Sequence, residues 1–398
     1  MKALLLENIH PGAEQLLSER GIEVETRKGA LDPSELAEAL QGVQLLGIRS
    51  KTHVTAEVLE QADELIAIGA FCIGTNQIDL DAAAARGTAV FNAPFSNTRS
   101  VVELAIAEII SMARRLTEKN ANMHAGVWDK SATGSHEVRG RTLGIVGYGN
   151  IGSQLSVIAE AMGMRVLFYD INDKLALGNA RKCESLDELL AEAETVSLHV
   201  DGRSGNAGMF GAEQFAKMRP RSLFLNLCRG FVVDHEALRE HLESGHIAGA
   251  AVDVFPEEPK ASGEPFVSTL QGLPNVILTP HVGGSTQEAQ VDIGQYVATK
   301  LRDYLAHGAT SMSVSLPQVG IEDVTDGPRL LYVHKNVPGV MGHVNGVLAE
   351  AGVNIERQML STRGELGYVV TDVAGSISDE AVSKLRELPE TVRLRVVD

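Results

Sequence analysis

Three residues that can do acid–base and anion chemistry follow successive apolar runs in the second half of the chain. Arg229, Glu258 and His281 each come just after a predicted strand of one sheet, at the edge where such sheets bind ligands. A guanidinium clamps a carboxylate, an imidazole exchanges the proton of a hydroxyl group, and a carboxylate orients the imidazole and stabilises its charged form. One such residue alone is usually structural, but the three together predict a catalytic site.

A glycine-rich turn precedes these residues. Gly147-Tyr148-Gly149-Asn150-Ile151-Gly152 follows the apolar run Leu143–Val146 and opens a predicted helix, Ser153–Met162. The first glycine allows the turn, the second lets backbone N–H groups approach a pyrophosphate, and the third lets the helix pack on the strand. We predict cofactor contacts at Gly147, Gly149, Asn150, Ile151 and Gly152.

An acidic residue ends the next predicted strand. Asp170 follows Val166–Tyr169, where a carboxylate binds ribose hydroxyls and repels a 2′-phosphate. We therefore predict NAD rather than NADP, although Lys174 nearby argues in the other direction. The predicted reaction transfers hydride between a substrate C2 and the nicotinamide, with His281 exchanging the hydroxyl proton and Arg229 binding the carboxylate.

The elements around these motifs predict an α/β protein with a doubly wound, Rossmann-type domain. Its predicted strands are Leu143–Val146, Val166–Tyr169, Thr195–His199, Ser222–Leu227, Gly249–Asp253 and Val276–Thr279. An earlier parallel sheet is predicted from Ala3–Leu6, Ile22–Thr26, Leu45–Ile48 and Leu65–Ala70, with helices Pro11–Arg20, Asp79–Arg86 and Ser100–Leu116. The last of these helices is largely apolar, which predicts burial between domains or subunits.

The C-terminal part has a different order of elements. After the predicted helix Gln287–His307, the polar stretch Val319–Gly327 is predicted to be a linker. The predicted elements beyond it are strand Leu330–His334, helix Gly339–Ala351, strands Asn354–Ser361 and Tyr368–Ala374, helix Asp379–Leu388 and strand Val392–Val397. This βαββαβ order is ferredoxin-like.

Composition excludes several classes of protein. The formal net charge of −17 disfavours nucleic-acid and anionic-membrane partners, which need clustered Lys and Arg. No apolar run reaches the roughly 18 residues of a membrane span, and no signal peptide is recognised, so we expect a cytoplasmic protein. Three widely spaced cysteines among 398 residues predict neither a metal site nor a disulfide.

The strings that carry the chemistry resemble those of the D-2-hydroxyacid dehydrogenase family. They are Arg229-Gly230, Asp253-Val254-Phe255 with Glu258-Pro259, and Thr279-Pro280-His281 with Gly283-Gly284. Within the family, Phe91–Ser100 and Gly283–Ala289 resemble the bacterial members that oxidise D-3-phosphoglycerate, the first step of phosphorylated L-serine biosynthesis. We predict further cofactor contacts at His199, Leu227, Cys228, Asp253, Gly283 and Gly284.

The resemblance also implies a domain organisation. A flavodoxin-like substrate domain, residues 1–96 and 284–325, is split around an NAD domain of residues 97–283. Substrate contacts are implied at Arg49, Ser50, Lys51, Asn97 and Lys28, and at Lys130 from a neighbouring subunit. The residue types support the contacts of Arg49, Ser50 and Lys51, because a basic loop after a strand suits a phosphate or carboxylate. Lys28 and Lys130 could equally be ordinary exposed lysines.

One loop departs from the family pattern. After His199-Val200, relatives usually have proline and two spaced threonines, whereas this chain has Asp201-Gly202-Arg203-Ser204-Gly205-Asn206-Ala207. We therefore expect a loop of different shape and assign no hydroxyl contact to NAD there.

The tail, residues 326–398, resembles an ACT domain, a ligand-binding module that pairs between subunits. The resemblance implies that His334, Asn336 and Asn354 bind L-serine as a feedback effector, and that the chain forms a homotetramer. In the alternative interpretation, the tail only holds a symmetric oligomer together.

Two other functions stay open. One is a related reductase of glyoxylate or hydroxypyruvate, or a relative that also accepts 2-oxoglutarate, although basic Lys28, Arg49 and Lys51 favour a dianionic substrate. The other is an NAD-sensing binding protein, as among related transcriptional co-repressors, which the acidic charge and ACT-like tail disfavour.

Overall fold

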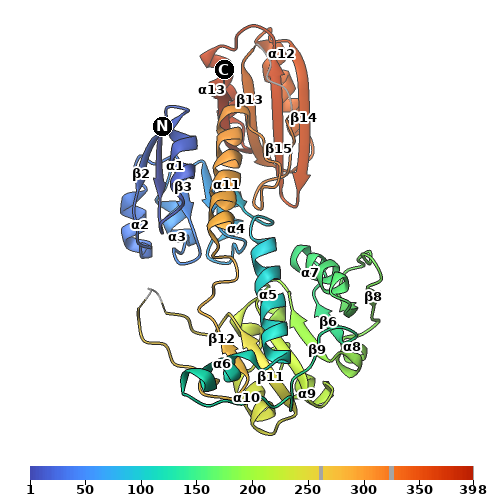
Figure 1. Cartoon of the computed structure of the whole chain (residues 1–398). Helices are drawn as coiled ribbons and strands as arrows, with labels where there is room; N and C mark the ends of the chain where they lie inside the picture. Colours follow the sequence, from blue (N-terminus) through green and yellow to red (C-terminus); the bar gives the residue numbers. More distant parts are fainter. Residues whose placement is uncertain (260–262, 322–326, 398) are drawn as a thin grey trace. The chain divides into compact units, whose positions relative to one another are not determined.

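The computed structural model describes residues 1–259, 263–321 and 327–397. The chain forms two compact units, Met1–Ser96 with Gln290–Asp398, and Asn97–Ala289 (Figure 1). No helix among the described residues is long and apolar enough to cross a membrane.

The first unit begins with a five-stranded parallel sheet in the order β2-β1-β3-β4-β5, a flavodoxin-like order. Its strands are β1 (Lys2–Leu5), β2 (Glu23–Thr26), β3 (Leu45–Ile48), β4 (Ala67–Ala70) and β5 (Ala89–Asn92). Its helices are α1 (Pro11–Ser18), α2 (Pro33–Ala39), α3 (Ala56–Glu60), α4 (Leu80–Ala85) and α11 (Gln287–His307). Every residue of β3, β4 and β5 is buried, as expected for strands covered on both faces.

The second unit holds a seven-stranded parallel sheet in the order β12-β11-β10-β9-β6-β7-β8. Its strands are β6 (Thr142–Val146), β7 (Arg165–Tyr169), β8 (Arg181–Lys182), β9 (Thr195–Leu198), β10 (Ser222–Asn226), β11 (Ile247–Val252) and β12 (Val276–Leu278). Its helices are α5 (Thr98–Ala113), α6 (Leu116–His124), α7 (Asn150–Ala161), α8 (Leu186–Glu192), α9 (Ala212–Lys217) and α10 (His235–Glu243), with 3₁₀ turns η1 (Ser204–Asn206) and η2 (Gly230–Val232). The strand order reverses between β6 and β9, and this reversal confirms the predicted doubly wound fold.

The predicted helix Ser100–Leu116 was wrong at its C-terminal end. Helix α5 ends at Ala113, and α6 begins at Leu116. Arg115 between them has a left-handed backbone with φ of 51°, which a continuous helix excludes. Its guanidinium pairs with Glu118 at 2.6 Å, in the first turn of α6, so the break is fixed by a local ion pair.

The C-terminal segment of the first unit folds as a four-stranded antiparallel sheet in the order β14-β15-β13-β16. Its elements are β13 (Arg329–Lys335), α12 (Val340–Glu350), β14 (Ile355–Arg363), β15 (Leu366–Val373), α13 (Asp379–Glu387) and β16 (Thr391–Val397). This confirms the predicted ferredoxin-like order. A buried ion pair between Arg329 and Asp372, 2.5 Å apart, joins β13 to β15.

The predicted linker Val319–Gly327 began too early. Val319 is buried, and its N–H donates to the hydroxyl of Thr310 at 2.8 Å. The middle of the predicted linker, residues 322–326, lies outside the described residues.

Candidate active site

The predicted acid–base pair is assembled in the second unit. Glu258 follows β11 and His281 follows β12, and these strands are parallel neighbours. Nδ1 of His281 lies 2.8 Å from Oε2 of Glu258, while Oε1 of Glu258 accepts the N–H of Phe255 at 3.1 Å. The carboxylate therefore fixes one ring nitrogen of His281 and leaves Nε2 for a substrate.

Arg229 lies at the same edge of the sheet. It follows β10, the other neighbour of β11, and its carbonyl accepts the side-chain amide of Asn226 at 3.0 Å. The next residue, Gly230, packs so tightly that a Cβ there would lie 2.0 Å from the carbonyl carbon of Phe255. Only glycine fits in this close contact, a constraint that was not predicted from the sequence.

The charges of the three residues influence one another. Burial acts to raise the pKa of Glu258, but the hydrogen bond and charge of His281, the Phe255 N–H and the charge of Arg229 together hold this pKa below its ordinary value. Glu258 therefore remains a carboxylate at neutral pH, as the predicted role requires.

Asp253 anchors the loop that carries His281. Its Oδ1 accepts the Thr279 hydroxyl at 2.6 Å and the Val282 N–H at 2.8 Å, and its Oδ2 accepts the Gly283 N–H at 2.8 Å. The carboxylate is almost fully buried. The structure therefore shows a loop-holding contact for Asp253, while its predicted contact with the cofactor stays a prediction.

The dinucleotide turn has the geometry that a pyrophosphate requires. Gly147 has φ of 93°, and a Cβ there would lie 2.5 Å from the carbonyl oxygen of His199. A Cβ on Gly152 would lie 2.2 Å from the Gly147 oxygen, whereas a Cβ on Gly149 would meet nothing within 4 Å. Helix α7 starts at Asn150 without a side-chain cap. The first turn of α7, which begins with Asn150 and Ile151, therefore presents backbone N–H groups beside the open space at Gly149, an arrangement that suits an anion.

The predicted ribose acid lies beside this turn. Oδ2 of Asp170 accepts the N–H of Tyr148 at 2.8 Å, and Oδ1 accepts the N–H of Asn172 at 2.8 Å. Asp170 thus joins the end of β7 to the turn after β6. The open glycine cradle, the uncapped helix start and this carboxylate fit a dinucleotide with free ribose hydroxyls.

Two other predicted cofactor residues are held in uncharged states. Burial lowers the pKa of His199 to about 4, and its Nε2 lies 2.8 Å from the Ser197 hydroxyl. Burial likewise raises the pKa of Cys228 to about 11, so its thiol donates to Oδ1 of Asn226 at 3.1 Å. Leu227 is buried between these strand ends. Neutral groups of this kind suit the uncharged parts of a cofactor.

The predicted basic loop lies in the first unit. Arg49, Ser50 and Lys51 follow β3, and Lys28 follows β2, on either side of β1. The buried carboxylate of Glu7 accepts the N–H groups of Arg49, Lys51 and Thr52 at 2.9–3.1 Å. Glu7 was not predicted from the sequence, because it shapes the loop through residues more than forty positions away.

The remaining predicted substrate residues belong to the second unit. Asn97 precedes α5, and a Cβ on Gly284 would lie 2.3 Å from its Nδ2. Oδ1 of Asn97 is buried without a hydrogen-bond partner among the described residues. Lys130 lies in an exposed loop after α6. The structure therefore packs Asn97 against Gly284, beside the Asp253-bound Gly283, but it does not bring Lys130 to these residues.

The predicted effector residues do not meet within one chain. Asn336 follows the end of β13 where Lys335 pairs with Leu366, and its amide donates to the Gly364 carbonyl at 3.1 Å. Asn354 precedes β14 at the opposite end of the sheet, where its carbonyl accepts the Ala374 N–H. His334 is buried, and its Nε2 has no partner among the described residues.

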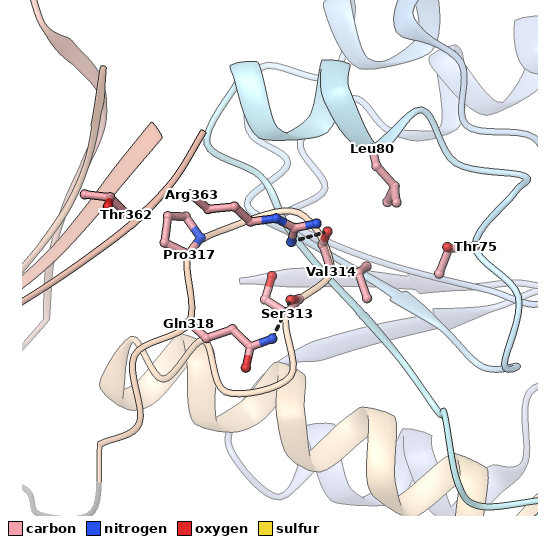
Figure 2. A pocket seen from close by; sticks show the side chains of 8 residues that line it. All are labelled: Thr75, Leu80, Ser313, Val314, Pro317, Gln318, Thr362 and Arg363. Carbon is pink, nitrogen blue, oxygen red and sulfur yellow. Dashed lines mark hydrogen bonds between the residues drawn. The ribbon is translucent and has the colours of Figure 1, made fainter. Parts of the chain in front are cut away.

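A separate cavity of about 570 Å³ lies in the first unit. Figure 2 shows Arg363, at the end of β14, donating to the Val314 carbonyl at 2.8 Å across one side of it. Thr75 and Leu80 line another side. None of the predicted site residues lines this cavity.

Comparisons with known proteins agree with this geometry. Residues 106–283 match the NAD-binding domain of the D-isomer specific 2-hydroxyacid dehydrogenases, and residues 330–393 match an AHAS small subunit-like ACT domain. The chain is 49% identical over 398 residues to D-3-phosphoglycerate dehydrogenase of Haemophilus influenzae, covering 100% of this chain and 97% of that protein. It is 48% identical over 400 residues to the Escherichia coli protein of the same name, with the same coverage.

Solved structures show the same architecture for the part that they cover. The TT0316 protein from Thermus thermophilus is 33% identical, with a TM-score of 0.70, and the match covers 77% of this chain and 97% of that one. D-lactate dehydrogenase from Aquifex aeolicus, complexed with NAD and lactic acid, is 25% identical, with a TM-score of 0.68 and coverage of 76% and 95%.

Proposed function

Because the chain belongs to the D-isomer specific 2-hydroxyacid dehydrogenase family, we propose that it oxidises D-3-phosphoglycerate to 3-phosphohydroxypyruvate with NAD. This reaction would open the phosphorylated route to L-serine. The observation that carries the proposal is the His281–Glu258 pair at 2.8 Å, with Arg229 at the same sheet edge, in a chain similar over its whole length to D-3-phosphoglycerate dehydrogenases.

Each residue of the pair has a defined task in the oxidation. His281 takes the proton of the C2 hydroxyl on Nε2, while Glu258 holds the ring by Nδ1 and compensates the positive charge that the ring gains. Arg229 binds the substrate carboxylate by two parallel hydrogen bonds and so fixes C2. Bound NAD supplies the hydride acceptor, so the C2 hydrogen leaves with its electron pair and a carbonyl forms. Asp253 keeps His281 in place by holding residues 279–283.

The basic residues account for the phosphate end of the proposed substrate. Arg49, Ser50 and Lys51 lie in a loop whose N–H groups are fixed by Glu7, so their side chains extend from a rigid base. Lys28 lies at the same sheet edge, and we keep Asn97 and Lys130 as further substrate contacts. An unphosphorylated 2-hydroxyacid whose only charge is the carboxylate that Arg229 binds would leave this positive charge without a partner.

We also propose that L-serine regulates the enzyme through the ACT domain. His334 and Asn336 lie at one end of its sheet and Asn354 at the other, so a site made of all three needs two domains paired in opposite directions. The exposed edge strand β14 offers the surface for such pairing. A homotetramer, a cytoplasmic location and the three-domain division at residues 96, 284 and 325 stay predictions.

A panel of 2-oxo acids separates this proposal from its alternatives. Initial rates with NADH should give the highest kcat/KM for 3-phosphohydroxypyruvate, with lower values for hydroxypyruvate, glyoxylate and 2-oxoglutarate. A preference for an unphosphorylated acid would make the chain another reductase of the family. NADH binding without turnover of any acid would support the NAD-sensing alternative.

A further inference from the structure

The loop that departs from the family pattern contains a solvent-facing ion pair. Nε of Arg203 donates to Oδ1 of Asp201 at 2.7 Å, and a second guanidinium nitrogen binds Oδ2. The side-chain amide of Asn206 also donates to Oδ1 of Asp201, at 3.0 Å. The side chains of Arg203 and Asp201 are 50% and 55% exposed. A pair this exposed contributes little to stability, so both groups can change partners at small cost.

Three contacts place this loop beside the cofactor cradle. Strand β9, which precedes the loop, pairs with β6, and the His199 carbonyl touches the Gly147 turn. Further along, a Cβ on Gly202 would lie 3.2 Å from Nε of Arg229. The loop therefore runs from the phosphate turn to the residue that clamps the substrate carboxylate.

The charge of Arg203 also reaches the ribose acid. The hydrogen bond and charge of Asp201, and then the charge of Asp170, hold the pKa of Arg203 above its ordinary value. Two other cations lie near these acids. The charge of Arg229 helps to lower the pKa of Asp201, and the charge of Asp170 helps to raise the pKa of Lys182, which pairs with Asp173. Arg203 is thus a cation that pairs with Asp201 and whose charge also interacts with Asp170.

We propose that Arg203 is a cofactor-binding residue that would leave Asp201 and bind the pyrophosphate of NAD. A guanidinium binds phosphate oxygens through the same planar fork with which it binds a carboxylate. A pyrophosphate brings two negative charges to the loop, which attract Arg203 and repel Asp201. In the protein without cofactor, Asp201 keeps Arg203 ordered and competes with NAD for it.

The proposal predicts opposite effects for the two members of the pair. Arg203→Gln should weaken the binding of NADH and of ADP-ribose by about 5- to 20-fold, because a charged hydrogen bond is lost. Asp201→Asn should tighten both by about 2- to 5-fold, because the competing charge is removed. Fluorescence titration of NADH and calorimetry with ADP-ribose measure these constants. Adenosine, which has no phosphate, should bind the two variants and the unaltered protein equally.

A structural role would give a different result. If the pair only stabilised the loop, both substitutions would break it and shift cofactor binding in the same direction. Arg203→Lys should restore part of the affinity, because it keeps the charge but not the fork. As a matched control, Arg139→Gln and Glu137→Gln alter another exposed pair of the same unit and should change nothing. Equal weakening by Arg203→Gln and Asp201→Asn, or no change with either, would overturn the proposal.

Discussion

The carboxylate of Glu258 lies 2.8 Å from Nδ1 of His281, and each group comes from the loop after a different strand of one sheet. The other carboxylate oxygen is occupied by the Phe255 N–H, so the acid cannot rotate freely away from the imidazole. The pair therefore has both a fixed geometry and a charge of the sign that a proton-accepting histidine requires.

Removing the charge of Glu258 while keeping its shape tests this relationship. Because the pKa of Glu258 is lowered, its carboxylate stays ionised below the ordinary pKa of a glutamate and is protonated only when the pH falls through the lowered value. Glu258→Gln removes that acidic titration and the compensating charge, so we expect a lower kcat and a changed pH dependence of kcat/KM. Glu257→Gln, at the adjacent exposed position, is the matched control. An unaltered profile would leave Glu258 with a structural role only.

We predict that Asp170 determines the preference for NAD over NADP. Asp170→Ala removes a charged hydrogen bond to the ribose, which costs about 1.5–3 kcal/mol, and also the repulsion of a 2′-phosphate. We expect weaker NAD binding and a smaller ratio of kcat/KM for NAD over NADP. Asp173→Ala, on the same loop and 96% exposed, should leave the ratio unchanged. If Asp170→Ala also leaves the ratio unchanged, the preference is set elsewhere.

Glu108 gives the folded protein an unusual dependence on pH. It is 3% exposed on α5 without a hydrogen-bond partner among the described residues, and burial and the charge of Asp253 raise its pKa from 4.5 to about 8. Between pH 4.5 and about 8, Glu108 is ionised in the unfolded chain but stays neutral in the folded protein. The free energy of unfolding therefore falls as the pH rises from 4.5 to about 8.

A neutral replacement should remove that loss. Glu108→Gln should gain free energy of unfolding relative to the unaltered protein as the pH rises from about 5 to about 8, measured by urea denaturation at several pH values. Glu103→Gln on the exposed face of α5, where Glu103 pairs with Arg99, is the control. A difference between Glu108→Gln and the unaltered protein that stays constant with pH would contradict the assignment.

Regulation by serine is tested most cleanly by a point variant. Ending the chain near residue 324 would remove Tyr368, whose hydroxyl donates to the Gly308 carbonyl at 2.6 Å in the core of the first unit. Asn336→Ala instead removes one exposed amide, and we expect serine inhibition about 2- to 10-fold weaker with unchanged NAD affinity. His343→Ala, exposed on α12, should leave inhibition unchanged. Calorimetry that detects no serine binding at millimolar concentration would leave the domain as an assembly module.

Most strand ends of the second unit were predicted from the sequence, because each apolar run stops shortly before a polar or charged residue of the candidate site. This pattern predicts Arg229, Glu258 and His281 at one edge of the sheet, and the parallel pairing of β10, β11 and β12 places the loops that carry them there. The α5–α6 break was missed because Arg115 takes a left-handed conformation without a glycine to signal it. Strand β5 was missed because Ala89–Asn92 is short and its burial depends on neighbours distant in sequence.

Side-chain contacts between residues distant in the sequence leave no local pattern from which they can be predicted. Glu7 supports Arg49 and Lys51 across more than forty residues, and no spacing rule connects these positions. The steric need for Gly230 comes from Phe255 on the adjacent strand end. In both cases the type of the site residue predicts its chemistry, whereas the groups that position it come close to it only in the folded sheet.

The proposed function requires that this chain oxidise D-3-phosphoglycerate with His281 as the base. NADH formation from D-3-phosphoglycerate and NAD, measured for the unaltered protein and for His281→Ala, tests it most directly. We predict turnover by the unaltered protein and a fall in kcat of roughly 10²–10⁴-fold in the variant, the range that general acid–base catalysis contributes, with NADH affinity nearly unchanged. No turnover by the unaltered protein, or a folded His281→Ala variant of undiminished kcat, would contradict it.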